Sequence, residues 1–568
     1  MKGAGVLAAC SLIGKALGAL YRLPLTTILG GEGMGEYQLV TSMYVLFFTL
    51  ACGGLPAAVS RTVAADRGTP RLALIVAGIG AASGLAFALI FVALSPLFSI
   101  IQGNGGTVTY LAVAPAIVFA SLLAGLRGYF QGKGNLMPTS VSQIIEQAVK
   151  LTVGLWLARI LVRGGAVPGA AGALIGVSVS EIVASGAVAA FLMIKTTEST
   201  EKEIKIAEST EKLLAASGLE AASDVVLDPD GTDNKKHQLQ TDFYETVGKR
   251  WGLQRGKEGS QPGESRSRKN NGTPRQAIRK TEVKSVAKAI IAAAVPVTAG
   301  ALVMPLTGVA DSFTVVNILA ARGLEAAEAT ARYGLVGGTV STLVNLPVTV
   351  AYAFAAALLP RVAGAANREK ANREIAFSVR LAFVFSVYVS AIYVIFARDI
   401  IEILYPSLSV FHKNLTTTLL RAEAPAVTYS SLLGVVTAAL QGSGKAGKAA
   451  KNLLIGGAAK VAVSAVSLYF SGVVGACVGT TACYAITLVL DVIELRAGTG
   501  FYAKGAKNLF FAAACGIAVA AATGLILSGA GALPRLATSA AAGAAVTCAL
   551  CGKAFGREER ARLPFSKH

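Results

Sequence analysis

Long, almost uninterrupted apolar segments dominate this chain and limit what it can fold into. They come in blocks of about 20 to 28 residues, rich in Ala, Leu and Gly, without alternation at every second position. A run of about 18 or more apolar residues can cross the hydrocarbon core as a helix, which satisfies all its own backbone donors. The sequence therefore predicts an all-α polytopic membrane protein and argues against a β-barrel.

About fourteen transmembrane helices are predicted, as two six-helix lobes in a pseudo-symmetric repeat plus two C-terminal helices. The predicted spans are 5–29, 38–65, 72–100, 108–130, 137–162, 167–194, 286–320, 334–359, 376–405, 416–441, 449–470, 473–495, 505–528 and 535–552. The predicted divisions are an N-terminal lobe (1–195), a flexible cytoplasmic loop (196–284), a C-terminal lobe (285–497), and two last spans with a basic tail (498–568).

A short signature supports the repeat. The tetrapeptide QGKG at 131–134 precedes Lys150, and QGSG at 441–444 precedes Lys460, with the same offset from Gln to Lys. Each tetrapeptide ends one apolar segment and each Lys lies in the next. Two related bundles that rock around a shared cavity are typical of secondary transporters.

The formal net charge of +20 follows the membrane topology. Lys and Arg gather in the loops after even-numbered spans, which places both termini and the 196–284 loop in the cytoplasm by the positive-inside rule. The basic stretch 266–269 lacks regularly spaced aromatic residues, so we expect contact with anionic lipid rather than nucleic acid. No enzyme motif is found, and we expect a non-enzymatic protein.

Charged side chains inside the spans carry the functional prediction, because such groups usually face a water-filled cavity or each other. They are Lys15, Arg22, Glu146, Lys150, Glu181, Asp311, Lys460, Asp491 and Glu494. Arg22 is the sharpest candidate, since it precedes Pro24, where a helix can bend, and since Arg binds phosphate oxygens bidentately. Snorkelling, or pairing with Glu146 or Glu36, is the structural alternative.

Other intramembrane charges allow two interpretations each. Asp311 beside Pro305 is a candidate site for Na⁺ or H⁺, or a structural hydrogen-bonding group. Glu146 and Lys150 form an i,i+4 pair that could neutralise itself. Lys460 has no acid nearby in sequence, so it is predicted to be a better cavity residue than Lys150.

Gly and Pro interrupt the second and eighth spans at corresponding places. The predicted gating or hinge residues are Pro24, Gly53, Gly54, Pro56, Asn345 and Pro347. Close packing between glycine-lined helices is the alternative interpretation.

The opening of the chain resembles a known family. Residues 14–25 (GKALGALYRLPL) and 29–38 (LGGEGMGEYQ) look like the stage V sporulation protein B branch of polysaccharide exporters. That branch lies in the multidrug, oligosaccharidyl-lipid and polysaccharide flippase superfamily, with the MurJ lipid II flippases. Further matches are 54–56 (GLP), 127–132 (RGYFQG) and 345–347 (NLP).

The resemblance implies a flippase that moves an undecaprenyl-linked saccharide precursor, lipid II or a related unit, for cell-wall or spore-cortex peptidoglycan. It also implies a bacterial cytoplasmic membrane protein, expected to be a monomer with no cofactor except a possible coupling Na⁺ or H⁺. MurJ-type cavity arginines correspond to Arg22, to a pair near Phe47 and Phe48, and to a position near Thr342, so only Arg22 is retained. The cavity candidates are Arg22, Lys15, Lys460, Gln131, Gln441 and Glu146.

Two other functions remain open from the sequence. A MATE-type cation or drug antiporter would share the architecture, but the intramembrane Lys and Arg of the first lobe disfavour it. A non-transporting membrane scaffold would act through the 196–284 loop.

Overall fold

The computed structural model describes residues 2–65, 70–103, 106–216, 275–365, 367–499 and 506–554, and every regular element in these ranges is a helix. The predicted all-α fold is confirmed. Residues Met1–Ala189 and Ser285–His568 form one compact unit, and Ala190–Lys284 form a second.

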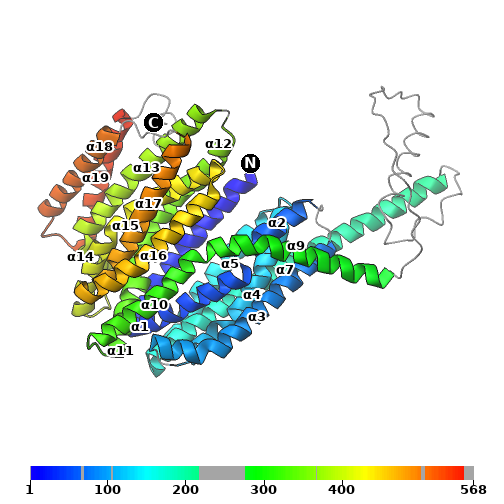
Figure 1. Cartoon of the computed structure of the whole chain (residues 1–568), viewed down its shortest axis with the longest axis horizontal. Coiled ribbons are helices and arrows are strands. Elements are labelled where there is room, and N and C mark those ends of the chain that lie inside the picture. Colours follow the sequence, from blue (N-terminus) through cyan, green and yellow to red (C-terminus); the bar gives the residue numbers. More distant parts are fainter. Residues whose placement is uncertain are drawn as a thin grey trace. The chain divides into compact units, whose positions relative to one another are not determined.

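The N-terminal half runs from blue to cyan in Figure 1. Its elements are α1 (Lys2–Cys52), α2 (Leu55–Ala65), α3 (Pro70–Gln102), α4 (Val108–Gly132), α5 (Met137–Val149), the π-helix η1 (Lys150–Gly154), α6 (Leu155–Leu161), the 3₁₀ turn η2 (Val162–Gly164) and α7 (Ala166–Ala216). The charged run 198–212, at the start of the predicted loop, is helical and part of α7.

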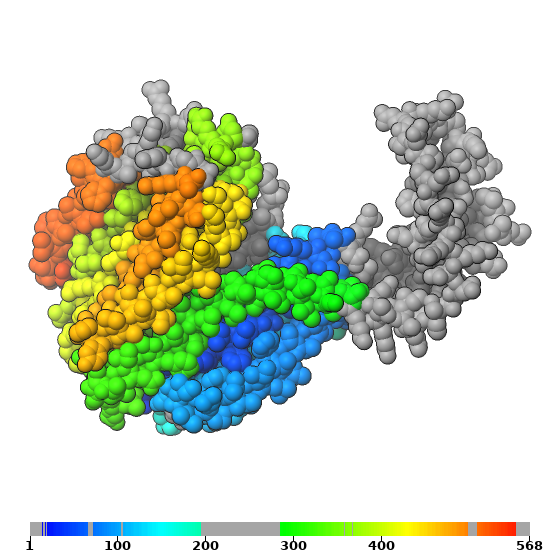
Figure 2. Space-filling view, in the orientation of Figure 1, coloured from blue at the N-terminus to red at the C-terminus, as the bar shows by residue number. Residues whose placement is uncertain are grey.

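The C-terminal half follows in green to red. Its elements are α9 (Arg275–Ala301), α10 (Val303–Ala321), α11 (Ala326–Gly334), the π-helix η4 (Leu335–Val340), α12 (Ser341–Ala363), α13 (Arg368–Ile395), α14 (Ala397–Leu404), α15 (Val410–Gly442), α16 (Ala446–Ser471), α17 (Val474–Thr499), α18 (Ala506–Ile526) and α19 (Ala532–Ala554). The halves touch each other, and in Figure 2 the green α10 lies against the blue N-terminal helices.

Eleven helical segments of the described chain are long and apolar enough to cross a membrane. The chain is therefore a multi-pass membrane protein, while the predicted count of fourteen is not confirmed. Two predicted boundaries explain part of the difference. The first and second predicted spans both lie in α1, which is kinked between them at the non-helical Gly30 (φ 67°, ψ −170°), and the fifth, 137–162, is divided among α5, η1 and α6.

The two QGxG tetrapeptides end α4 and α15 in the same way. The N–H of Gly134 donates to the Gln131 carbonyl at 3.0 Å, and the N–H of Gly444 donates to the Gln441 carbonyl at 3.0 Å. Gly134 and Gly444 have φ of 73° and 79°, the left-handed conformation that closes a helix C-terminus. The last glycine of each repeat therefore terminates a helix.

The first glycine of each tetrapeptide permits close helix packing. A Cβ on Gly132 would lie 2.6 Å from Val63 Cβ of α2, and a Cβ on Gly442 would lie 3.0 Å from Val362 Cβ of α12. Helices approach this closely only where no side chain intervenes. The repeat thus encodes the same turn and the same kind of helix contact in both halves.

Gly53 and Gly54 do interrupt a span, because α1 ends at Cys52 and α2 begins at Leu55. The predicted interruption at Asn345 and Pro347 is wrong, since α12 runs through both. Pro347 has no N–H to give to the Leu343 carbonyl, and the Tyr393 hydroxyl of α13 donates to that carbonyl instead, at 2.8 Å. The irregular backbone of this span lies earlier, in η4.

Candidate functional site

Arg22 lies on α1 and reaches into the other half of the protein. Its Nη1 donates to the Gly337 carbonyl of η4 at 3.2 Å and to Thr342 Oγ1 of α12 at 3.2 Å. The side chain is half-buried. Arg22 therefore joins the two halves through neutral acceptors.

No carboxylate of the described chain pairs with Arg22, and its Nε and Nη2 donate no hydrogen bond there. The predicted alternative partners are engaged elsewhere. Glu146 pairs with Arg127, and Glu36 accepts a hydrogen bond from Thr109 Oγ1 at 2.7 Å. A guanidinium with spare donors and an uncompensated charge is suited to bind an anion.

Lys150 provides a second cation near Arg22. It opens η1, and its Nζ lies 5.2 Å from the centroid of the Tyr21 ring. Both Lys150 and Arg22 act electrostatically on the buried Tyr37 of α1. Because no described carboxylate forms an ion pair with Lys150, the two cations make a positively charged region beside α1.

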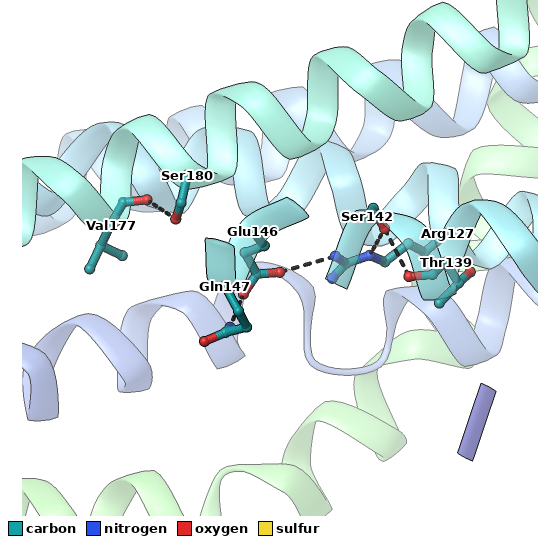
Figure 3. A network of polar contacts seen from close by, with 7 residues as sticks. All are labelled: Arg127, Thr139, Ser142, Glu146, Gln147, Val177 and Ser180. Atoms are coloured by element: carbon teal, nitrogen blue, oxygen red, sulfur yellow. Dashed lines mark hydrogen bonds and ion pairs between the residues drawn. The ribbon is translucent and has the colours of Figure 1, made fainter. Parts of the chain in front are cut away.

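The expected Glu146–Lys150 pair does not form. Glu146 Oε2 lies 3.0 Å from Arg127 Nη2 of α4, whose Nε donates to Ser142 Oγ at 2.9 Å. Figure 3 shows this network, with Gln147 donating to Glu146 Oε1 at 3.0 Å. The backbone between the two residues is regular, since the Lys150 N–H donates to the Glu146 carbonyl. The pair is lost because Arg127 of α4 takes the Glu146 carboxylate and the Lys150 ammonium lies by the Tyr21 ring.

Lys460 and Asp311 pair with each other. Lys460 Nζ of α16 lies 2.5 Å from Asp311 Oδ2 of α10, and both side chains are largely buried. The sequence ranked Lys460 above Lys150 as a cavity residue because no acid is near it along the chain, and the structure supplies one from a remote position. The Lys460 ammonium thus lies beside Asp311, the residue for which the sequence predicted a Na⁺ or H⁺ site.

Glu423 belongs to the same cluster but was not among the predicted residues. It is 2% exposed on α15, accepts a 3.4 Å hydrogen bond from Ser341 and lies near Lys460 and Cys477. It sits inside the predicted span 416–441, so its position among apolar residues was the signal that could have identified it.

Breaking the Lys460–Asp311 pair is expected to destabilise the protein. In Lys460→Met the Asp311 carboxylate stays buried without its partner, which costs about 3–5 kcal/mol in free energy of unfolding. Thermal unfolding in detergent measures the loss. Lys460→Met combined with Asp311→Asn should recover much of it, and an unchanged melting temperature in the single variant would show that the pair is dispensable.

The other predicted site residues lie away from Arg22 and Lys150, or their side chains fall outside the described part of the chain. Gln131 and Gln441 are at helix ends, with carbonyls that cap the QGxG turns. The side chain of Lys15 lies outside the described part of the chain, although its backbone is in α1. Among the gating candidates, Gly54 contacts the other half, since its N–H donates to Thr298 Oγ1 of α9 at 2.9 Å.

A second contact between the halves is built on glycines, and we call it the glycine seam. It consists of residues 31–38 of α1 and residues 330–338 of α11 and η4. A Cβ on Gly35 would lie 2.1 Å from the Thr330 carbonyl oxygen, and one on Gly334 would lie 2.3 Å from the Gly35 nitrogen. Backbone meets backbone here, so side chains other than hydrogen cannot be accommodated without separation.

Comparisons with known proteins agree with this architecture. Residues 1–218 match the family model described as polysaccharide biosynthesis protein. The chain is 24% identical over 471 residues to stage V sporulation protein B of Bacillus subtilis (strain 168), covering 81% of this chain and 76% of that protein. Lipid II flippase MurJ of the same organism is 30% identical over 169 residues, 27% of this chain and 31% of MurJ.

Solved structures show the fold. Lipid II flippase MurJ in an inward closed conformation matches with a TM-score of 0.66, covering 96% of this chain and 98% of that chain at 10% identity. An inward-facing multidrug resistance MATE family transporter matches with a TM-score of 0.55, covering 86% and 94% at 14% identity. The chain therefore has the fold of these membrane transporters, and its resemblance to the stage V sporulation protein B branch of polysaccharide exporters is confirmed.

Proposed function

We propose that this protein moves a lipid-linked saccharide diphosphate across the cytoplasmic membrane by alternating access. The observation that carries the proposal is Arg22, a half-buried cation between the halves with spare donors and no described acid partner. A diphosphate cannot cross hydrocarbon unaided, whereas its polyprenyl tail can remain in lipid. The names of the relatives, a lipid II flippase among them, support the same substrate class.

Arg22 also suggests how substrate binding is linked to movement. A ligand shifts a conformational equilibrium only through different affinity for the two states. Here the Arg22 Nη1 bonds to Gly337 and Thr342 hold the halves together. A diphosphate that takes over these donors weakens the contact, so substrate binding favours separation. Protonation or Na⁺ binding at Asp311, with release of Lys460, is our proposal for the coupling step.

A cell depleted of its own lipid II flippase tests the function. We expect expression of this chain to restore growth and the appearance of lipid-linked precursor on the outer surface, measured with a membrane-impermeant probe. If growth fails although membrane insertion is verified, lipid II is not the substrate, and surface exposure of other lipid-linked saccharides must then be measured.

The MATE-type antiporter is the second candidate, because the MATE fold matches over most of the chain. Such a transporter needs a cavity that attracts organic cations, and the Arg22 and Lys150 charges oppose this. Resistance to cationic drugs in cells that express the chain, without any effect on lipid-linked precursors, would favour it.

A further inference from the structure

Glu181 is a buried acid that the proposed diphosphate site does not use. It lies on α7 and is 8% exposed. Within the described chain it forms no hydrogen bond and no ion pair, although neighbouring acids such as Glu146 form both. A buried carboxyl group without a hydrogen-bond partner is costly, so its presence suggests a ligand that supplies the missing partners.

The groups around Glu181 are balanced in charge. Glu146, Arg127 and Lys150 all act on it electrostatically, so the cluster contains two carboxylates and two cations. Figure 3 shows Ser180, the residue before Glu181, on α7 alongside Glu146 and Gln147 of α5. Counting Lys150, which this cluster shares with the Arg22 region, the formal charges cancel, so the cluster has little net attraction for an ion and suits a neutral polar ligand.

Two more polar groups in this cluster have spare hydrogen-bonding capacity. The Tyr44 hydroxyl, close to Glu181 and Glu146, makes no hydrogen bond within the described chain. The Gln147 amide donates to Glu146 through Nε2, while its Oε1 accepts no hydrogen bond there. Carboxylate, amide oxygen and phenol are groups that pair with hydroxyl and acetamido groups.

An aromatic surface adjoins these groups. The rings of Tyr44 and Phe48 lie 6.0 Å apart with an interplanar angle of 27°, and both side chains are half-buried. A flat ring beside a few fixed polar groups suits the apolar face and the polar edge of a sugar. Lys150 lies between this cluster and the Arg22 region, since it acts on Glu181 and on Tyr37.

We propose that Glu181, Tyr44 and Gln147 form a recognition site for the uncharged saccharide of the lipid-linked substrate, adjacent to the Arg22 and Lys150 diphosphate site. This inference rests on the proposed function and adds a specificity site to it. The carboxylate of Glu181 accepts sugar hydroxyl or amide protons, and Tyr44 and Phe48 cover the ring. A site built around such bonds discriminates strongly against a ligand that lacks the donors.

Binding to the full chain in lipid nanodiscs tests the site with two probes. One is a polyprenyl diphosphate carrying an N-acetylated disaccharide, and the other is the same polyprenyl diphosphate without sugar. Glu181→Gln and Tyr44→Phe should each weaken binding of the sugar-bearing probe about tenfold, which corresponds to the loss of one hydrogen bond. Neither should alter binding of the sugar-free probe, and Arg22→Ala should weaken both.

Glu369→Gln is the matched control, because Glu369 is an exposed acid paired with Arg373 on α13. It should leave both affinities unchanged. The saccharide site is refuted if Glu181→Gln affects both probes equally or neither, or if it changes only the pH dependence of transport. Equal wild-type affinity for the two probes also refutes it, yet leaves the diphosphate proposal standing. Binding of neither probe refutes both proposals.

Discussion

Replacement of Arg22 by alanine is expected to abolish most transport while the protein still folds and inserts. Hydrogen bonds to charged groups contribute about 1.5–3 kcal/mol each, so losing two on a diphosphate weakens substrate binding by about a hundredfold or more. Arg22→Lys keeps the charge but loses the planar fork, and should fall between wild type and alanine. The measurement is surface-exposed lipid-linked precursor in flippase-depleted cells at equal expression.

Arg421→Ala supplies the control for the loss of an intramembrane arginine. Arg421 also donates to a backbone carbonyl, that of Val394 at 3.2 Å, but it is exposed on α15. We expect this variant to transport like wild type. Full transport by Arg22→Ala would mean that the cation is only a structural contact to η4 and α12, and the diphosphate site would have to be sought elsewhere.

Thr342 shows how sequence and structure complement each other at this site. The family resemblance placed an eighth-helix arginine near this position, and here the Thr342 hydroxyl accepts a hydrogen bond from Arg22. One arginine therefore faces a neutral acceptor where two arginines would repel. That relation could not be read from the sequence, because the two residues are separated by 320 positions.

Features that depend on short stretches of sequence, the membrane helices and the turns of the repeat, could be predicted. Apolar length predicts the membrane helices, and the QGxG repeat predicts related halves, because a helix end and a close helix contact each need glycine at a fixed place. The repeat also predicts that Gln131 and Gln441 are cavity residues. In the structure their carbonyls accept the hydrogen bonds that close the two helix ends. A turn signature and a binding signature use the same polar residues, so spacing alone does not separate them.

Ion pairs between helices that are distant along the chain could not be predicted from the sequence. Lys460 seemed unpaired because Asp311 is remote along the chain, and Glu146 seemed paired because Lys150 is near. Glu146 is instead taken by Arg127 of the neighbouring helix α4, although its i,i+4 spacing to Lys150 is intact. Which partner a buried charge takes is decided by the packing of helices, and the order of residues along one helix does not reveal it.

Substitution of Gly35 by alanine is expected to shift the protein toward a state in which the glycine seam is open. The added Cβ would lie 2.1 Å from the Thr330 carbonyl oxygen, a backbone atom that cannot rotate away. Overpacking of this kind costs about 1–3 kcal/mol, which raises the population of the separated state about five- to 150-fold. The orientation predicted by the positive-inside rule puts the seam at the outer surface, so we propose that opening it gives an outward-facing state.

A cysteine at Met34 reports the opening. Met34 is fully buried, and its side chain lies against Gly338 across the seam. In a chain whose native cysteines are replaced by serine, Met34→Cys should react slowly with an impermeant thiol reagent added to intact cells. Adding Gly35→Ala should accelerate labelling by the factor given above.

Gly78→Ala is the matched control, because a Cβ at Gly78 of α3 would meet nothing within 4 Å. It should leave the labelling rate unchanged. Equal rates in the Gly35 and Gly78 variants would show that the seam does not separate during the cycle, and alternating access would then require another outer closure. Faster labelling in the Gly35 variant alone would support the glycine seam as the outer closure. Arg22, bonded to Gly337 within that same seam, is then the residue through which a bound diphosphate would loosen it.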